Sequence, residues 1–262
     1  MVDSGSPSLL EPDYWWYRVR AVLLERAVGR FVDDAHLVLD VGSADAPSAG
    51  WLKQGRHTVP LDIDHRGIAP GGVCGSAEAL PFADNTFDAV AAFDVIEHCA
   101  DESLALSEIH RVLRVGGVLL LSVPAYQWAW TEHDVHNGHF RRYTRTRITQ
   151  SLEGAGLTVL RSTHMFAGTF PFFAADRLRT RRREARRPDL QELDRREQVL
   201  TLPRVSPVVE KVLLGASRLD HQLLGRWDLP FGSSVVCVAE KTGASSGPSR
   251  AADSSNSESL AT

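Results

Sequence analysis

Short apolar runs alternate along the chain with longer segments whose apolar residues recur at helical spacing. The short runs predict buried strands, and the longer segments predict helices with one apolar face. We expect strands at 36–41, 58–63, 72–75, 89–93, 118–123, 157–163 and 233–239. We expect helices at 13–31, 46–54, 101–113, 146–155 and 205–225. This alternation predicts an α/β fold with a Rossmann-like, doubly wound parallel sheet.

The first expected strand carries the strongest indication of function. Its apolar run from Leu37 to Val41 contains one carboxylate, Asp40, and ends at Gly42 in a turn of small residues. Ligands of open α/β sheets bind beyond the carboxyl ends of such strands. Asp62 follows 22 residues after Asp40, at the end of the second apolar segment. The pair predicts a nucleoside cofactor whose ribose is bound by the second acid.

The residues of the turn after this strand indicate which cofactor is bound. Dinucleotide sites use G-x-G-x-x-G so that backbone amides can approach a pyrophosphate, whereas residues 42–47 read Gly-Ser-Ala-Asp-Ala-Pro. The missing glycines argue against an NAD-dependent oxidoreductase, and the carboxylates of Asp40 and Asp45 would repel a phosphate. S-adenosylmethionine (SAM) has no phosphate and carries an ammonium and a sulfonium, which suit these acids. An ordinary strand–turn–helix with a surface aspartate is the alternative.

The composition is that of an ordinary globular protein. The 262 residues are 43% hydrophobic and 24% charged, and the net charge of −4 gives no general attraction to nucleic acid. Cys74, Cys99 and Cys237 lack metal-ligand spacing and are expected to be reduced thiols. The N-terminal stretch is acidic, and no apolar run approaches the ~20 residues of a membrane span. We therefore expect a cytoplasmic protein.

Motifs at four places follow one another in order. They are Val-Leu-Asp-Val-Gly at 38–42, Leu-Asp-Ile-Asp at 61–64, Glu-Ala-Leu-Pro-Phe-Ala-Asp-Asn-Thr-Phe-Asp at 78–88, and Asp-Val-Ile-Glu-His at 94–98 leading to Arg-Val-Leu-Arg-Val-Gly-Gly at 111–117. Together they resemble the class I SAM-dependent methyltransferases, specifically the type 11 group. The resemblance implies the seven-stranded fold of that class, with SAM as the cofactor, and a methyltransferase activity.

The resemblance covers roughly 36–165 together with the last strand, which suggests how the chain is divided. We expect an N-terminal helical segment (1–35), a SAM-binding core (36–165), a helical and basic insertion that selects the substrate (166–232), the last core strand (233–241) and a disordered tail (242–262).

The resemblance also implies a set of cofactor-binding residues: Asp40, Gly42, Asp62, Ser76, Ala77, Phe93 and Asp94. Asp40 would orient the turn or meet the ammonium of SAM, and Asp62 would accept both ribose hydroxyls. Ser76 and Ala77 would border the adenine. Phe93 and Asp94 would lie near the methionine moiety and the methyl group.

The chain departs from the family pattern at three positions. Ala44 and Ala46 stand where the family usually has glycines, and Ser76 stands where it often has an acid. Alanine is small enough for a close approach of the cofactor but is strained where φ must be positive. A SAM-binding protein with weak or no catalysis is therefore an alternative function.

The segment after the fifth strand, residues 124–144, holds the candidates for a catalytic base. It combines histidines, acids and aromatic residues, a mixture suited to the rim of a pocket. Transfer of a methyl group to a hydroxyl or an amine benefits from a general base, and we expect His133, Asp134 or His136 to serve as one. The histidines could also bind a metal, but methyl transfer needs none, and no metal is expected. A further alternative is pairing within the loop, of Asp134 or Glu132 with His139, Arg141 or Arg142.

An apolar stretch followed by arginines lies in the expected insertion. Residues 165–175 carry four phenylalanines, and 177–187 carry seven arginines. We interpret 165–187 as a segment that docks at the inner face of an anionic membrane, where a lipid-linked acceptor can enter. The alternative buries the phenylalanines under the helix at 205–225 and leaves the arginines in water.

The expected partner is thus a small-molecule or lipid-linked acceptor, methylated at oxygen or carbon. An RNA methyltransferase is an alternative that the arginines suggest. The net charge of −4 and the lack of a recognisable RNA-binding module argue against it, so no nucleic acid partner is expected.

Overall fold

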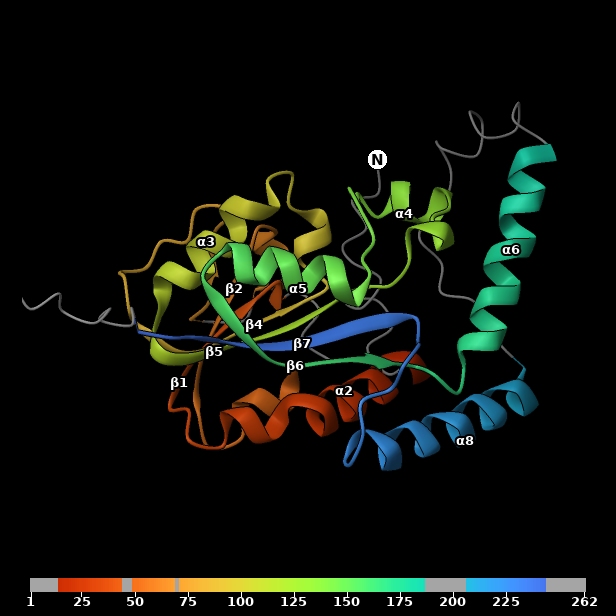
Figure 1. Cartoon of the computed structure of the whole chain (residues 1–262), viewed down its shortest axis with the longest axis horizontal. Coiled ribbons are helices and arrows are strands. Elements are labelled where there is room, and N and C mark those ends of the chain that lie inside the picture. Colours follow the sequence, from red (N-terminus) through yellow and green to blue (C-terminus); the bar gives the residue numbers. More distant parts are fainter. Residues whose placement is uncertain (1–13, 44–48, 69–70, 187–205, 244–262) are drawn as a thin grey trace, which may run out of the picture.

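The computed structural model describes residues 14–43, 49–68, 71–186 and 206–243, which form a seven-stranded sheet between helices (Figure 1). Across the sheet the strands follow the order β3-β2-β1-β4-β5-β7-β6. Their bounds are β1 (Leu37–Val41), β2 (His57–Asp62), β3 (Val73–Cys74), β4 (Phe87–Phe93), β5 (Leu113–Pro124), β6 (Leu157–Met165) and β7 (Ser234–Lys241). The expected α/β fold with a Rossmann-like, seven-stranded sheet is confirmed.

The last strand runs in the opposite direction to the others. β7 lies between β5 and β6 and is antiparallel to both, whereas the remaining pairs are parallel. The prediction of an entirely parallel sheet is therefore wrong for β7. An apolar run indicates that a strand is buried on both faces but carries no information on its direction.

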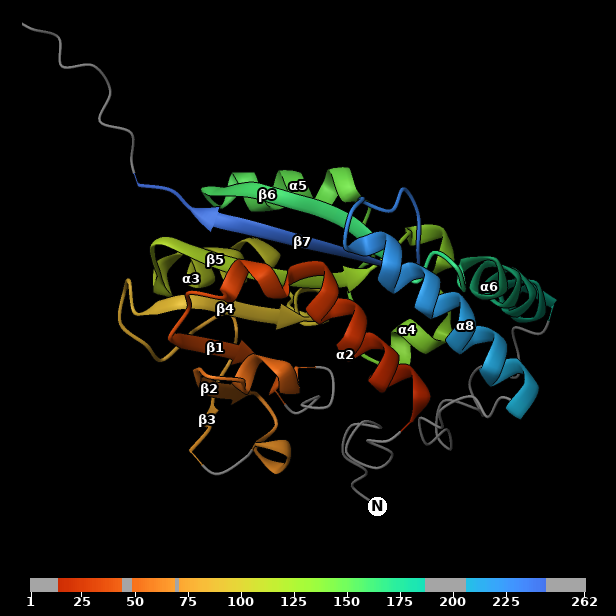
Figure 2. The same cartoon turned by 90° about the horizontal axis from the view of Figure 1, so that it is seen from below.

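Helices cover both faces of the sheet (Figures 1 and 2). α2 (Trp15–Val28) and α8 (Pro207–Leu224) lie on one face, and α3 (Glu102–Val112) and α5 (Arg145–Gly154) lie on the other. Each face has its own buried core. The shorter elements are α4 (Glu132–His136) and the 3-10 turns η1 (Gly29–Val32), η3 (Gly50–Lys53), η4 (His65–Gly67), η5 (Ile96–His98) and η6 (Gln127–Ala129).

Two elements differ from the prediction in their extent. β5 begins at Leu113, directly after α3, so Gly116 and Gly117 lie inside the strand instead of preceding it. Gly116 has a φ of +79°, and a Cβ on Gly117 would lie 2.8 Å from the Arg114 carbonyl oxygen, so both positions suit glycine. Of the helix expected at 46–54, residues 46–48 lie outside the described residues, and the rest forms only the turn η3.

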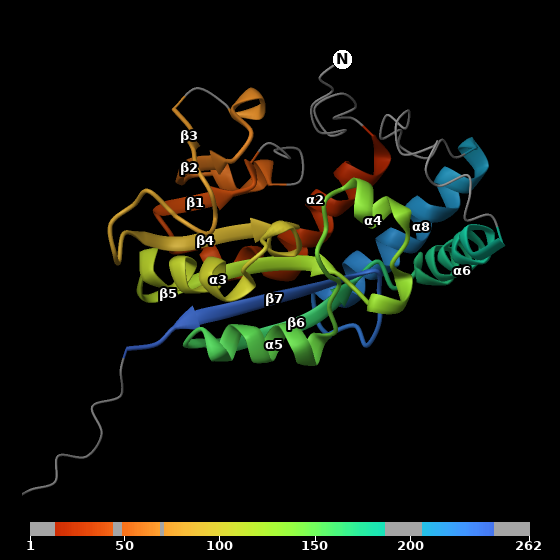
Figure 3. The same ribbon diagram turned by 90° about the horizontal axis from the view of Figure 1, so that it is seen from above.

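The loop after β5 and the first part of the chain after β6 lie beyond the carboxyl ends of the parallel strands (Figure 3). Figure 3 shows α4 and α6 (Phe170–Arg186) at that edge, with α6 projecting away from the sheet. Within the described part of the chain, none of the helices has the length and apolar character to cross a membrane. The expected disordered tail falls almost wholly on 244–262, outside the described residues.

Candidate functional site

Four segments that leave the sheet at one edge contain a residue with left-handed backbone. Gly42 follows β1 with a φ of +78°, Asp94 follows β4 with 56°, Tyr126 lies just beyond β5 with 63°, and Phe166 follows β6 with 64°. These four strands are mutually parallel within the sheet, so the strained residues share one edge. Positive φ is costly for residues other than glycine and gathers at ligand sites. The carboxyl edge is therefore where a binding site is expected.

Gly42 allows the turn after β1 to pack against the turn after β4. Its backbone N–H donates to the Leu61 carbonyl oxygen at 2.8 Å, which extends the pairing of β1 with β2. A Cβ at this position would lie 2.5 Å from Cγ2 of Val95. Both the φ and this contact exclude a side chain, so the backbone of Gly42 is left open to a ligand on the other side. Ala44 and Ala46, which stand at family glycine positions, lie outside the described residues.

A buried ion pair crosses from α2 to the end of β4. Nη2 of Arg20 lies 2.9 Å from Oδ2 of Asp94 and donates to Oγ of Ser122 at 2.9 Å. Ser122 in turn donates to Oδ1 of Asp94 at 3.1 Å. Arg20 is only 3% exposed, and its Nη1 has no hydrogen-bond partner among the described residues. The site therefore offers a buried cationic nitrogen with hydrogen-bonding capacity to spare.

This pair lines a pocket at the edge of the sheet, together with Trp16, Asp40, Gly42 and Phe93. Four of these six residues are among those that the resemblance predicts to bind the cofactor, whereas Arg20 and Trp16 are not. Both lie on α2, where helical spacing predicts burial but does not indicate what the helix packs against. An arginine placed on the apolar face of an expected helix was the available signal, because such a residue is seldom buried without a partner.

Asp40 and Asp62 both lie at the carboxyl edge. Burial raises the pKa of Asp40 to about 7; Lys53 opposes the rise and Asp62 adds to it. A positively charged ligand would favour the ionised form of Asp40. Oδ1 of Asp62 accepts the backbone N–H of Asp64 at 2.8 Å, which fixes the carboxylate at the end of β2.

Ser76 and Ala77 lie in the loop after β3, also at the carboxyl edge. Oγ of Ser76 accepts the backbone N–H of Glu78 at 3.1 Å, and Ala77 is 9% exposed. The serine hydroxyl retains its own O–H and a second lone pair for a ligand.

The loop after β5 is organised around the buried carboxylate of Asp134. Thr131 and Asp134 form a capping box at the start of α4, in which Asp134 accepts the backbone N–H of Thr131 at 2.9 Å. Oδ1 of Asp134 also accepts from Nδ1 of His139 at 2.9 Å and from Nε of Arg142 at 2.7 Å. Burial raises the pKa of Asp134, but the bonds from His139 and Arg142 outweigh it and lower the pKa to about 2. These contacts are the pairing within the loop that the sequence left open as an alternative.

The other two candidate bases lie on α4. Nδ1 of His136 donates to the Glu132 carbonyl oxygen at 2.7 Å, and its Nε2 has no partner among the described residues. Nε2 of His133 accepts from Asn137 at 3.0 Å. Partial desolvation and the charge of Arg177 lower the pKa of His133, although the residue as a whole is exposed. The ring of His133 is thus available as a neutral imidazole near pH 7.

Comparisons with known proteins give a consistent result. Residues 39–121 match the model of a family described as a methyltransferase domain. A probable S-adenosylmethionine-dependent methyltransferase of Mycolicibacterium smegmatis is 31% identical over 176 residues, which cover 62% of this chain and 66% of that protein. The ubiquinone/menaquinone biosynthesis C-methyltransferase UbiE of Xanthomonas oryzae is 35% identical over 122 residues, 45% of this chain and 44% of that one. The aligned part thus spans less than two thirds of either relative.

The fold is also similar to that of a solved methyltransferase structure. A SAM-dependent methyltransferase from Archaeoglobus fulgidus superimposes with a TM-score of 0.55 over 90% of this chain and 100% of that one. The two sequences are 16% identical, so this likeness concerns the fold alone.

Proposed function

The chain belongs to the class I SAM-dependent methyltransferases, and from this premise we propose that it transfers the methyl group of SAM to a small-molecule or lipid-linked acceptor. The observation that carries the proposal is the pocket at the carboxyl edge, where Arg20 and Asp94 present opposite charges beside the open backbone of Gly42. SAM has a carboxylate and an ammonium on one carbon, so a site with both charges fits it.

In the proposed arrangement, the residues of the pocket bind the methionine end of SAM. Nη1 of Arg20, which has no partner among the described residues, would donate to the carboxylate, and Asp94 or Asp40 would accept from the ammonium. Gly42 would let the cofactor lie against the backbone, and Phe93, which also lines the pocket, would border it. When bound, SAM supplies an electrophilic methyl group on sulfur, and the protein mainly contributes proximity and exclusion of water.

The residues after β2 and β3 are proposed to bind the nucleoside end. Asp62 would accept the ribose hydroxyls, and Ser76 and Ala77 would border the adenine. Their place in the fold supports this, because Asp62 ends β2, the neighbour of β1, and Ser76 and Ala77 follow β3, the neighbour of β2, all at the carboxyl edge.

A proton acceptor is proposed from α4. His133, whose pKa is lowered, carries a neutral imidazole at neutral pH, and its ring or that of His136 can accept a proton from an acceptor hydroxyl. Asp134 is the least suitable of the three candidates for a general base, because its carboxylate is fully buried and already accepts hydrogen bonds from three groups. We propose that Asp134 positions the loop and that one of the two histidines acts as the base.

The function is tested first by cofactor binding. Replacing Asp62 with alanine should weaken the binding of SAM by about 1.5–3 kcal/mol, because hydrogen bonds to a charged partner have this value. Isothermal titration calorimetry of the folded protein with SAM, S-adenosylhomocysteine and NAD provides the measurement. We expect binding of the first two and none of NAD.

Asp64 offers a matched control for this variant. It lies two residues after Asp62, and its carboxylate pairs with Arg66. Asp64→Ala should leave SAM affinity unchanged. Unaltered affinity in a folded Asp62→Ala protein would refute the ribose assignment, and absence of SAM binding by the wild type would refute the proposed function. Transfer of label from methyl-labelled SAM to lipid or aqueous extracts then identifies the acceptor class.

A lipid-linked acceptor is favoured by the surface of α6. The helix projects beyond the sheet edge that holds the pocket, and Phe172 and Leu178 are 58% and 46% exposed. Phe166, in contrast, is buried against Trp16, with the rings stacked at 5.9 Å. The aromatic stretch thus divides between the core and the surface, and we propose that its exposed part contacts an anionic membrane.

Only some of the arginines are available for such a contact. Arg177 donates to Oγ1 of Thr131 at 2.7 Å, and Arg181 donates to the Trp128 carbonyl oxygen at 2.6 Å, so both hold α6 against the loop after β5. Arg179, Arg182 and Arg183 are exposed, and none of them has an ion pair among the described residues. These three are the arginines that the proposal assigns to lipid headgroups.

Changing Arg179, Arg182 and Arg183 to glutamate should abolish binding to anionic vesicles. Each arginine near such a surface contributes about 1 kcal/mol, so the loss should exceed about 3 kcal/mol. Co-sedimentation with phosphatidylserine-containing and with neutral vesicles measures it, and wild-type binding should weaken as salt is added.

The charge-matched control changes Arg18, Arg26 and Arg30, exposed residues of α2 and η1, to glutamate. This triple variant should still sediment with anionic vesicles. Wild-type protein that stays in the supernatant at low salt, or equal loss in both variants, would exclude docking through α6 and leave a freely soluble acceptor.

A further inference from the structure

Glu97 carries a buried carboxylate near the carboxyl end of β4. It lies in η5, directly beyond β4, and its side chain is 0% exposed. Neither Oε1 nor Oε2 has a partner among the described residues. An ionised carboxylate in such a place is strongly unfavourable unless a cation or several donors compensate it.

The nearby cations are already engaged. Arg20 pairs with Asp94 at 2.9 Å, and Arg142 pairs with Asp134 at 2.7 Å. Glu97 thus requires either a proton or a cation of its own.

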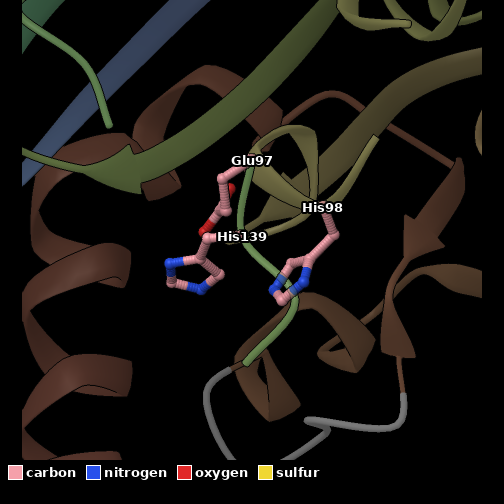
Figure 4. A group of neighbouring side chains, drawn as sticks. All are labelled: Glu97, His98 and His139. Atoms are coloured by element: carbon pink, nitrogen blue, oxygen red, sulfur yellow. The ribbon is translucent and has the colours of Figure 1, made fainter. Parts of the chain in front are cut away.

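Two imidazoles lie beside this carboxylate (Figure 4). The ligand atoms of Glu97, His98 and His139 all lie within 4.8 Å of one another, and the two rings meet edge to face with centroids 4.7 Å apart. The Phe140 backbone N–H donates to the Glu97 carbonyl oxygen at 2.8 Å. This bond clamps the loop that carries His139 to the turn that carries Glu97 and His98.

The orientation of the His139 ring is fixed by a hydrogen bond to a buried carboxylate. Its Nδ1 donates to Asp134 at 2.9 Å, and Asp134 is held in turn by Arg142. This bond fixes the tautomer, so Nε2 carries the lone pair. A carboxylate–histidine pair of this kind is the usual support of a metal-ligating imidazole, because it orients the ring and raises its basicity.

We propose that Glu97, His98 and His139 bind one divalent transition-metal ion. Two imidazoles and a carboxylate suit Zn²⁺, Mn²⁺, Fe²⁺ or Co²⁺ better than Mg²⁺ or Ca²⁺, which prefer oxygen ligands. Bonds of about 2.0–2.2 Å require a tighter group than the present one, and rotation of the exposed His98 side chain can close it.

A bound metal ion would specify the class of acceptor used in the proposed function. This part of the inference therefore rests on that proposed function. Three protein ligands leave coordination positions for water or an acceptor oxygen. Glu97 follows Asp94, which lines the cofactor pocket, by three residues. The acceptor class is then one that ligates a metal through oxygen, such as a phenol, an enol or a carboxylic acid. Of the histidines whose spacing first suggested a metal, only His139 joins the group.

The test uses the full chain without an affinity tag, stripped with a chelator and measured without SAM or acceptor. Titration with Zn²⁺ against a chromogenic chelator should show one equivalent bound per chain, and Co²⁺ should give a visible absorption band from its ligand field. Glu97→Gln and His139→Gln should each weaken binding at least about 10-fold, the lower limit for disturbing even a supporting residue of a metal site.

His57→Gln is the matched control, because this exposed histidine lies at the start of β2, at the opposite edge of the sheet. It should bind Zn²⁺ as the wild type does. Glu97→Gln keeps the shape of the side chain, and thermal melting confirms that it is folded. No stoichiometric Zn²⁺ binding, or equal affinity in wild type and Glu97→Gln, would overturn the metal site and indicate a protonated Glu97. SAM titration of the same stripped protein reports separately on the proposed function.

Discussion

Asp134→Ala is expected to destabilise the protein by about 3–5 kcal/mol, the cost of removing one partner of a buried ion pair. Asp134 is 0% exposed, and its partner Arg142 is 5% exposed, so the variant leaves a guanidinium buried without its counter-ion. The change also removes one of the two bonds of the capping box of α4 and the acceptor for His139. Urea denaturation of the metal-free protein measures the free energy of unfolding.

An exposed ion pair provides the control. Asp84 pairs with Arg111 at 2.8 Å, but the aspartate side chain is 67% exposed. Asp84→Ala should cost less than about 1 kcal/mol, because solvent screens such a pair. If Asp134→Ala cost no more than Asp84→Ala, the buried network would not stabilise the loop, and the positioning role proposed for Asp134 would be wrong.

The same carboxylate predicts the pH dependence of stability. Its pKa in the folded protein is about 2, below the value of about 3.9 in an unfolded chain. The stabilisation is therefore complete above about pH 4 and is lost as the pH falls through about 2, since the unfolded state binds the proton more tightly. The unfolding free energy of the wild type should fall more steeply over this range than that of Asp134→Asn.

The sequence contained enough information for the sheet and for the acids at its edge. Asp40, Gly42, Asp62 and Asp94 each follow directly from a short apolar run, because the end of a buried parallel strand is also the edge where ligands bind. For these residues, the apolar pattern that predicts a strand also predicts where a ligand binds. The same pattern did not give the direction of β7, which depends on how the chain returns from α8.

The rest of the site depends on contacts between segments far apart in the sequence. Arg20 and Asp94 are 74 positions apart, and nothing in either segment indicates the other. The pairing of Asp134 with His139 and Arg142 was an open alternative, because a carboxylate among histidines and arginines suits a base as well as a structural ion pair. Burial favours the structural interpretation of Asp134, and burial is a property of the packed chain.

Arg20→Met should weaken the binding of SAM by about 2–5 kcal/mol, the range for truncating a buried, hydrogen-bonded charge at an interface. The proposed carboxylate contact would be lost, and Asp94 would lose the partner that fixes its position beside the ammonium. Methionine retains much of the length of the side chain, which limits the loss of packing against Trp16. Calorimetry with SAM measures the change in affinity.

Two comparisons separate binding of the carboxylate from a general effect on the fold. Arg18 lies on the same helix but is exposed, so Arg18→Met should bind SAM as the wild type does. 5′-Methylthioadenosine keeps the nucleoside and sulfur of the cofactor but lacks its amino-acid end, so Arg20→Met should bind it with nearly wild-type affinity. If the variant lost affinity for both ligands equally, Arg20 would support the pocket without contacting the carboxylate, and the cofactor would have to lie with its methionine end elsewhere along the carboxyl edge of the sheet.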